Sequence, residues 1–296
     1  MSMTPPDDSA AICHPLEPLT EGEIQEAVRL LRAEDRIGPR TRIAAVALHE
    51  PPKAVVRAVA SEIRGERRAW VNLLDSQDGA VYEAVVCLSS GTVEHWERIP
   101  GVQPPFLSEE AQECEAAIKA DLAFQAALQQ RGISDLDLVM VEAWPAGNYW
   151  GEHNTLRLAH GLAWLRSEPG DNAFARPIEG LSAIVDLNAQ RVMKIEDTGA
   201  VPIPPESGNY AARYLAEIRQ DLKPIEITQP DGPSFVVNGH HVRWQKWDFR
   251  IGWTPREGLV LHTVGYEDGG RVRQILYRAS LSEMVVPYGD PSSGHY

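Results

Sequence analysis

Apolar and polar positions in the first third of the chain predict one helix followed by a sheet. Four apolar residues recur at the spacing of one helical face: Ile24, Ala27, Val28 and Leu31. Thr20 and Glu23 form a capping box in front of them, which predicts a helix over 21–33. Short apolar runs predict strands at 42–48, 69–74, 81–88 and 92–99.

The same order of elements recurs after Pro104-Pro105. Ser108 is expected to cap a second helix, with Glu109 and Glu110 at its positive end and Gly132 closing it. Strands are expected at 136–143, 155–165, 181–187 and 191–197. The order is repeated, but we find no strong residue-level repeat between the two units.

The last third of the chain has a different pattern. Residues 199–234 are rich in Pro and Gly and predict a linker, with a short helix near 211–219. Strands are expected at 234–237, 241–249, 258–266 and 271–284, with a hairpin turn at Asp268-Gly269-Gly270. These strands are too few for a complete sandwich, so the third domain is expected to be incomplete.

Together the patterns predict an α+β fold. Two small domains, each of one helix on an antiparallel sheet, precede the truncated start of a β-sandwich domain. A disordered tail is expected over residues 1–12, and the two small domains over 13–100 and 101–200. A linker over 201–233 then leads to the incomplete domain over 234–296.

Composition narrows the function classes. Lys and Arg total 28 against 42 Asp and Glu, so the net charge of −14 argues against nucleic-acid binding and against docking on anionic membranes. The three cysteines are widely spaced, which favours a reducing compartment. No signal peptide and no apolar run of membrane-spanning length is evident, so we expect a cytoplasmic protein.

Histidines and tryptophans are the residue types that would suggest a metal site or a base-stacking surface. His240 and His241 are adjacent after Asn238-Gly239, so a turn is favoured over a shared metal site. The spacing of His153 and His160 matches no common metal-ligand pattern. Trp244 and Trp247 are three residues apart, which in one strand places them on opposite faces and favours packing over base stacking.

Four stretches in the last third of the chain have a sequence that is typical of one protein family: Lys223–Phe235, Val242–Trp247, Pro255–His262 and Tyr277–Pro291. Together they resemble the copper-containing amine oxidases. Asp197-Thr198-Gly199 and Gly208-Asn209-Tyr210 also resemble the linker of that family. The resemblance is strong from about 177 to 291 and weaker before it, where the two units are similar to the small domains that precede the family's catalytic domain.

The resemblance implies oxidation of primary amines by O₂ to aldehydes, with release of ammonia and hydrogen peroxide. It also implies copper held by three histidines, a topaquinone made from a tyrosine, and an aspartate base. This sequence has no His-x-His, and neither Asn148-Tyr149-Trp150 nor Asn209-Tyr210-Ala211 has the acid that follows the quinone tyrosine in the family. The base aspartate is expected beyond Tyr296. We therefore assign no catalytic, cofactor-binding or metal-binding residue, and expect copper and topaquinone only in the full-length family.

One peripheral residue is implied by the resemblance. Phe174, in Asn172–Pro177, occupies a position where some relatives place a tryptophan at the substrate funnel, although simple packing is the alternative. We expect the N-terminal portion of a copper/topaquinone primary-amine oxidase, inactive alone and forming a homodimer or completed by a second chain. The alternative is a stand-alone non-catalytic homologue that acts as a scaffold or dimerisation module.

Overall fold

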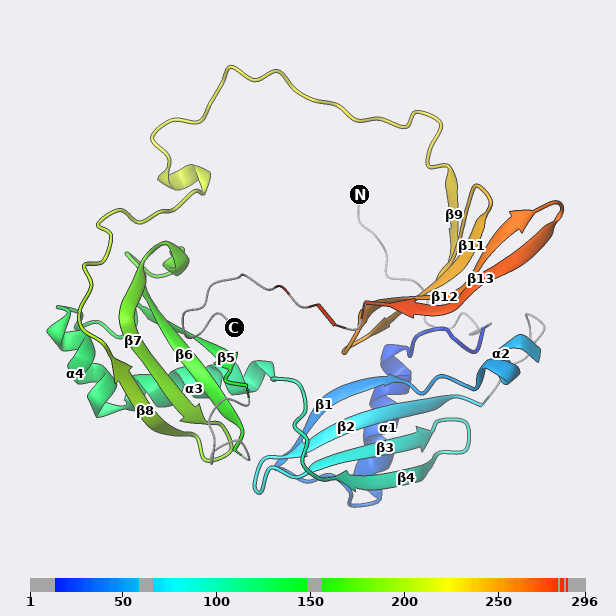
Figure 1. The fold of residues 1–296 in the computed structure, drawn as a ribbon, viewed down its shortest axis with the longest axis horizontal. Coiled ribbons are helices and arrows are strands. Elements are labelled where there is room, and N and C mark those ends of the chain that lie inside the picture. Colours follow the sequence, from blue (N-terminus) through cyan, green and yellow to red (C-terminus); the bar gives the residue numbers. More distant parts are fainter. Residues whose placement is uncertain (1–13, 59–65, 148–155, 282, 285, 287–296) are drawn as a thin grey trace. The chain divides into compact units, whose positions relative to one another are not determined.

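The chain folds into three antiparallel sheets and four α-helices within the described residues. The computed structural model describes residues 14–58, 66–147, 156–281, 283, 284 and 286 (Figure 1). Strand orders are β1-β2-β3-β4, β5-β6-β7-β8 and β13-β12-β11-β10-β9. The predicted α+β class is confirmed, whereas the predicted disordered tail, Tyr149, His153 and the end of the Tyr277–Pro291 stretch lie outside the described residues.

By their internal contacts the residues form two compact units. One combines the chain up to Leu74 with Val81–Ile99 and the residues from Ile227 onward, and so contains the first and third sheets. The other consists of Asp75–Ala80 and Pro100–Glu226 and contains the second sheet. Within the described part of the chain, no helix is both long and apolar enough to cross a membrane. The four predicted boundaries between the five parts stay predictions.

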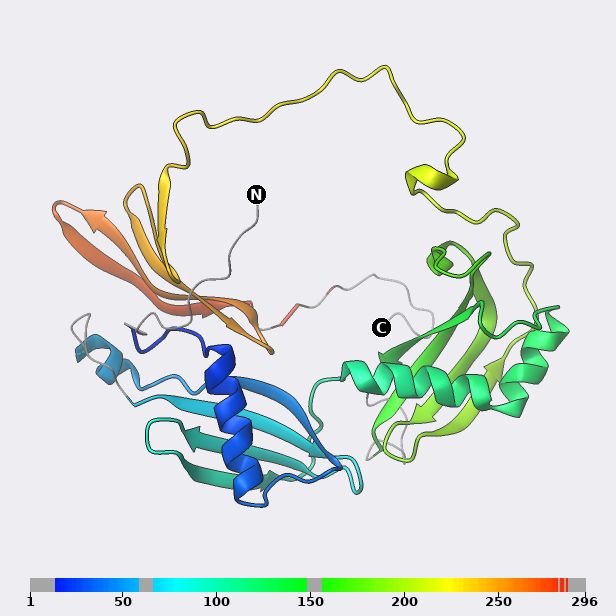
Figure 2. The same cartoon turned by 180° about the vertical axis from the view of Figure 1, so that it is seen from behind.

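The first sheet packs one face against a single long helix. Helix α1 (Glu21–Ala33) lies across β1–β4, as Figure 2 shows. The strands are β1 Thr41–Leu48, β2 Arg68–Asp75, β3 Val81–Cys87 and β4 Thr92–Ile99. The core between them is small and apolar: Ala27, Leu30, Leu31, Ala69, Val71, Leu73, Ala84 and Val86. A short helix α2 (Lys53–Ala58) follows β1 and was not predicted, because six residues carry too little helical periodicity.

The start of α1 is held by an arginine from the neighbouring strand. The predicted capping box is confirmed: the Thr20 hydroxyl accepts from the Glu23 amide, and the Glu23 carboxylate accepts from the Thr20 amide. Arg67, directly before β2, donates to both Glu23 oxygens at 2.9 Å. It also donates to the carbonyls of the segment that leads into the helix, Pro15, Glu17 and Pro18.

The second sheet carries two consecutive helices rather than the single one predicted. Helices α3 (Ser108–Ala120) and α4 (Leu122–Gln130) meet at Asp121, whose backbone is extended. The Asp121 carboxylate accepts from the amides of Ala123 and Phe124, so it caps α4 and breaks the helix. The strands are β5 Val139–Pro145, β6 Leu158–Leu165, β7 Pro177–Asp186 and β8 Arg191–Asp197. A 3₁₀ turn, η2 (Ala173–Ala175), precedes β7.

The predicted cap of the second helix is also corrected. Ser108 is the first helical residue, and the N-cap is Leu107, whose side chain makes no capping hydrogen bond. The Glu110 carboxylate instead accepts from the Leu107 amide at 2.9 Å. Glu110 is therefore more than a favourable charge near a helix dipole, because it supplies the hydrogen bond that an apolar N-cap cannot make.

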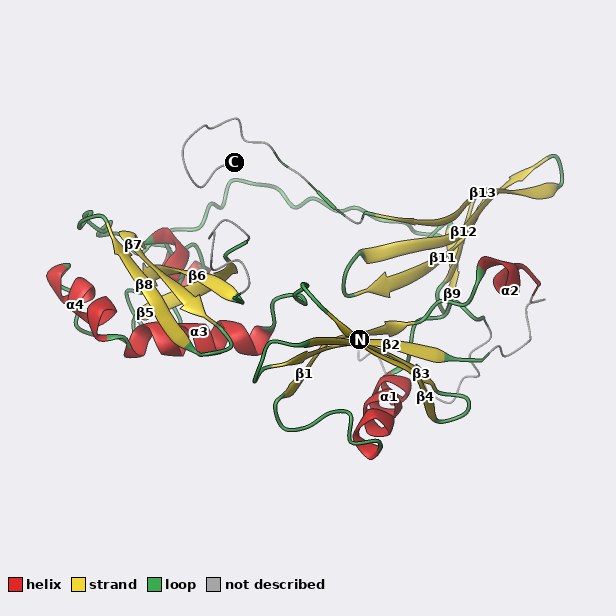
Figure 3. Cartoon of the chain, turned by 60° about the horizontal axis from the view of Figure 1, so that its bottom comes forward, coloured by secondary structure: helices red, strands yellow, loops and turns green. Residues whose placement is uncertain are grey.

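The linker contains only a 3₁₀ turn, η3 (Ala212–Tyr214), where a short helix over 211–219 was predicted. The third sheet then follows as a meander of neighbouring strands (Figure 3). Its strands are β9 Phe235–Asn238, β10 His241–Trp244, β11 Trp247–Thr254, β12 Gly258–Asp268 and β13 Arg271–Ser280. The single strand predicted over 241–249 is two strands, because a tight turn at Gln245-Lys246 lies between them.

That turn overturns the expectation for the two tryptophans. Trp244 and Trp247 are direct partners across the β10–β11 hairpin, so they lie on the same face of the sheet. The alternation argument failed because it assumed one continuous strand. Gln245 has a positive φ of 56°, which tight hairpin turns require, but no Gly or Asn marks the turn in the sequence.

Candidate functional site

The second unit contains an open groove of about 530 Å³ between the start of α3 and strand β5. Twelve residues line it: Phe106, Leu107, Ser108, Ala111, Gln112, Glu115, Met140, Val141, Glu142, Ala143, Arg166 and Phe174. Strand β5 is an edge strand of its sheet, and the Val141 amide donates to the Glu115 carboxylate of α3 at 3.2 Å. This bond ties α3 to the edge strand and closes one side of the groove.

Phe174, the residue singled out from the sequence, is one of the residues that line this groove. It lies in η2, where the Asn172 side chain accepts from the Phe174 amide. The Asn172 amide in turn donates to the Asn209 side chain of the linker at 3.0 Å. The residue is 58% exposed, and its ring contacts that of Trp164 edge to face, with centroids 5.5 Å apart. Phe174 is thus held by its neighbours while most of its surface faces the groove or solvent.

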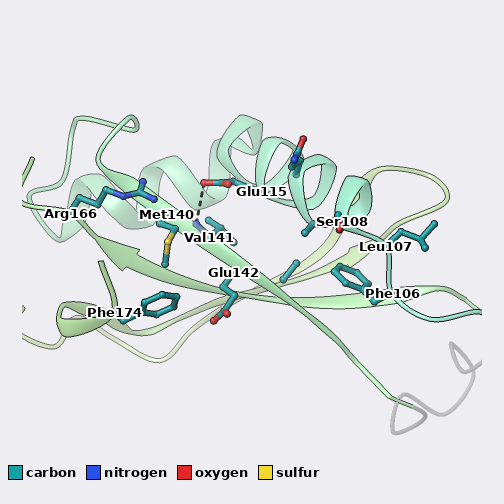
Figure 4. A pocket seen from close by; sticks show the side chains of 12 residues that line it. Phe106, Leu107, Ser108, Glu115, Met140, Val141, Glu142, Arg166 and Phe174 are labelled. Atoms are coloured by element: carbon teal, nitrogen blue, oxygen red, sulfur yellow. Dashed lines mark hydrogen bonds between the residues drawn. The ribbon is translucent and has the colours of Figure 1, made fainter. Parts of the chain in front are cut away.

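Two charged side chains accompany the apolar ones. Figure 4 places Glu142 between the rings of Phe174 and Phe106, with Arg166 near Met140. Neither Glu142 nor Arg166 forms an ion pair with another described residue. A carboxylate between aromatic rings is the pattern that attracts an organic cation, through charge and through the ring faces. Sequence reasoning did not find Phe106 or Glu142.

The opposite wall of the groove is held from behind by a buried ion pair. Arg157, directly before β6, donates to both Glu110 oxygens at 2.6 and 2.7 Å. The same guanidinium donates to the carbonyls of Pro104 and Pro105, the residues that precede Phe106. Both charged side chains are almost completely buried, at 6% and 2% exposed. The guanidinium of arginine suits this set of acceptors because its N–H donors are fixed in one plane, like the prongs of a fork.

The other predicted candidates do not form a site with this groove. His240 lies in the β9–β10 turn and pairs with Glu17, whereas His241 pairs with Asp248, so the two rings have different partners. His160 lies in β6, and burial lowers its pKa although Glu196 opposes this. Tyr210 is 80% exposed in the linker. Within the described part of the chain, no three His, Cys, Asp or Glu residues gather to hold a metal ion, so these residues do not fit copper.

The third sheet has one charged and one apolar face. His241, Arg250, His262 and Arg278 form one row across four strands. Arg250 pairs with Glu17 at 2.5 Å and Arg278 with Glu50 at 3.0 Å, so this face is joined to the residues around the first domain. Trp244, Trp247 and Tyr266 are register partners on the other face, and Phe235 extends the row.

Much of the apolar face is uncovered within the described structure. Trp253 and Leu259 are direct partners on it and are 70% and 51% exposed. The segments Leu259–Leu261 and Ile275–Leu276 are expected to expose apolar surface in an incomplete domain, and Leu259, Ile275 and Leu276 do so. Val260 corrects this expectation, because it is completely buried, and Leu261 is half-buried. Patches of this kind on a folded sheet mark a surface that another part of a protein covers.

Three family models match successive parts of the chain. They are the AGAO-like N2 domain over residues 20–96, the copper amine oxidase N3 domain over 109–214, and the copper amine oxidase enzyme domain over 236–296. The last match begins within the first strand of the third sheet.

Several amine oxidases match nearly the whole chain. A primary amine oxidase of Arthrobacter sp. (strain P1) is 46% identical over 281 residues, which are 94% of this chain and 43% of the relative. A peroxisomal copper-containing diamine oxidase of Nicotiana tabacum is 39% identical, over 97% of this chain and 42% of its own. The crystal structure of a copper-containing benzylamine oxidase from Hansenula polymorpha is 25% identical with a TM-score of 0.75, covering 95% and 46% of the two chains. The chain therefore spans less than half the length of the relatives it matches.

Proposed function

The chain belongs to the copper amine oxidase family and corresponds to its N2 domain, its N3 domain and part of its enzyme domain, so we propose that it forms part of an enzyme that oxidises primary amines. In the proposed reaction a primary amine, O₂ and water give an aldehyde, ammonia and hydrogen peroxide. The observation that carries the proposal is the match of all three family models in succession along one chain.

Copper and the quinone belong to the remainder of the enzyme domain in this proposal. The residues that the structure describes do not offer them a site: His240 and His241 are each engaged by a different carboxylate, and Tyr210 lies in the linker. We derive no chemical step through either group. The exposed apolar face of the third sheet supports the proposal, since it leaves room for a larger sheet domain to pack.

We also propose that the groove lies on the path of the amine, with Phe174 at its rim. The supporting features are the Glu142 carboxylate, which would attract an ammonium group, and the exposed Phe174 and half-buried Phe106 rings, which would contact its apolar tail. The Hansenula polymorpha relative is named a benzylamine oxidase, so an aromatic ammonium ion is a suitable probe. A homodimer and a cytoplasmic location stay predictions, and one plant relative is named as peroxisomal.

A direct test uses the chain alone. After incubation with copper and air, redox-cycling quinone staining and an amine-dependent peroxide assay should both be negative, because the copper and quinone motifs are absent from the sequence. Copper(II) bound weakly by scattered imidazoles would not change either result. A stained band or amine-dependent peroxide would contradict the assignment of catalysis to the remainder of the enzyme domain.

A further inference from the structure

The wall of the groove formed by Phe106–Ser108 is held by apolar packing, with Phe106 on the core of the second unit and Leu107 buried, and by a small set of hydrogen bonds. Its N-cap side chain makes no hydrogen bond, and two of the three residues before Phe106 are prolines, which lack backbone N–H donors. Two side chains make these hydrogen bonds: the Leu107 amide donates to Glu110 of α3, and the Pro104 and Pro105 carbonyls accept from Arg157. Replacing Arg157 therefore removes the hydrogen bonds to the two carbonyls that precede Phe106 and loosens the segment that carries its ring.

We propose that Arg157 and Glu110 are positioning residues for the aromatic wall of the amine-binding groove. The two side chains lie behind the wall and do not line the groove, so they act through Phe106 rather than by touching an amine. Phe106, Phe174 and Glu142 all line the groove, and in the view of Figure 4 the Glu142 side chain lies between the two rings, so a cation held in the groove depends on both rings staying in place. This inference rests on the proposed amine path.

The chain offers a matched control for this assignment. Arg67 makes the same fork in the first domain, with Glu23 and the carbonyls of Pro15, Glu17 and Pro18, but it lies in the other compact unit. Lysine in place of either arginine keeps the positive charge beside the glutamate. A single ammonium cannot reproduce the planar fork that reaches the carbonyls, so each substitution releases only the leading segment.

The test is a titration of the full chain with benzylammonium. Binding is detected by NMR through the methyl resonances of ¹³C-labelled methionines. Met140 lines the groove, whereas Met193 in β8 does not and serves as the internal reference. Wild type should show a saturable shift at Met140 and none at Met193. Arg157→Lys should weaken binding about three- to tenfold, the effect of ordering one more side chain on binding. Phe106→Ala should weaken it similarly, and Arg67→Lys should leave it unchanged.

Each outcome bears on a separate statement. Equal affinity of Arg157→Lys and wild type, an equal loss in Arg67→Lys, or no effect of Phe106→Ala would overturn the positioning role while leaving the amine path intact. If wild type gives no shift at Met140, the proposed amine path fails, and the positioning role falls with it. Should Arg157→Lys fail to fold, Glu110→Gln replaces it, because the amide keeps an acceptor for Leu107 but loses the charge that orients the fork. It should then show the same direction of change.

Discussion

In both the N2 and the N3 domain an arginine–glutamate ion pair holds the start of the helix, but the surroundings of the two pairs differ. Arg67 and Arg157 each lie directly before the second strand of their sheet and pair with the third helical residue, Glu23 or Glu110. Each arginine carbonyl accepts from the residue after the third strand, Leu88 at 2.8 Å and Leu187 at 2.9 Å. The two domains therefore share a residue-level repeat, which sequence comparison alone had not revealed.

The surroundings of the two pairs differ in a way that changes their energetics. In the first domain the side chains of Arg67 and Glu23 are 13% and 17% exposed, and Thr20 adds a side-chain cap. In the second domain the ion pair of Arg157 and Glu110 is almost completely buried. The Leu107 side chain makes no capping hydrogen bond, so the start of α3 depends on this one ion pair. A buried pair contributes little net stability over apolar residues, but removing one partner leaves a buried charge. The comparison therefore predicts that the same substitution lowers the free energy of unfolding more at Arg157 than at Arg67.

The largest effect is expected for Arg157→Met. The substitution leaves Glu110 buried without its cation, which costs about 3–5 kcal/mol of the free energy of unfolding. Hydrogen exchange measured peptide by peptide in increasing urea reports each domain separately. Destabilisation should be confined to the N3 peptides. A cost below about 1 kcal/mol would mean that Glu110 is satisfied by other groups, and the contrast between the domains would be lost.

A smaller effect is expected for Arg67→Met. Glu23 keeps its hydrogen bonds to the Thr20 amide and partial access to water, so the cost should be about 1–3 kcal/mol, confined to the N2 peptides. The same exchange experiment in urea measures it. Equal costs in both domains would show that burial of the pair does not decide its energetics.

Thr20→Ala should cost about 1 kcal/mol, because the hydroxyl caps α1. Ser108→Ala is the matched control in the second domain, where the serine is the first helical residue and its change should stay within about 0.5 kcal/mol. Thermal unfolding followed by circular dichroism compares the two variants. A larger loss in Ser108→Ala would restore serine as the cap of α3.

The smallest effect is a pH dependence carried by Glu23. Burial raises the pKa of Glu23, but hydrogen bonds from Arg67 and the Thr20 backbone outweigh it, so the pKa lies below the ordinary glutamate value. A depressed carboxyl pKa contributes stability that is present above the unfolded value of 4.5 and is lost as pH falls through the lower folded value. The N2 domain should therefore lose stability below about pH 4.5, and Glu23→Gln should flatten that part of the profile. An unchanged profile would exclude Glu23 as its source.

Local patterns in the sequence were sufficient for most elements of the fold. Helix α1 follows from Thr20, Glu23 and an apolar stripe, because each acts within a few residues. The hairpin at Gln245-Lys246 carries no glycine or asparagine, and only pairing with neighbouring strands reveals it. The break at Asp121 was within reach of sequence reasoning, since aspartate before Leu122 and Ala123 is a usual N-cap.

The groove could be anticipated only in part. Phe174 was singled out through its resemblance to the family, and the structure places it at the groove. Phe106, Glu142 and Arg166 come from a helix leader, a strand and a strand end, and only tertiary packing gathers them. Arg157 and Glu110 are 47 residues apart, and no local pattern links them. Comparison of the two domains position by position around their helix starts could have found that pair.

The central claim is that this chain supplies the N2 and N3 domains and the first sheet of a copper amine oxidase, whose chemistry resides in the rest of the enzyme domain. The most direct measurement joins residue 296 of this chain in frame to the remaining enzyme domain of the Arthrobacter sp. (strain P1) relative and assays peroxide after loading with copper. The account predicts peroxide that depends on benzylamine or another primary amine, and none from the chain alone. A copper-loaded, folded fusion that stains for quinone but oxidises no amine would contradict it.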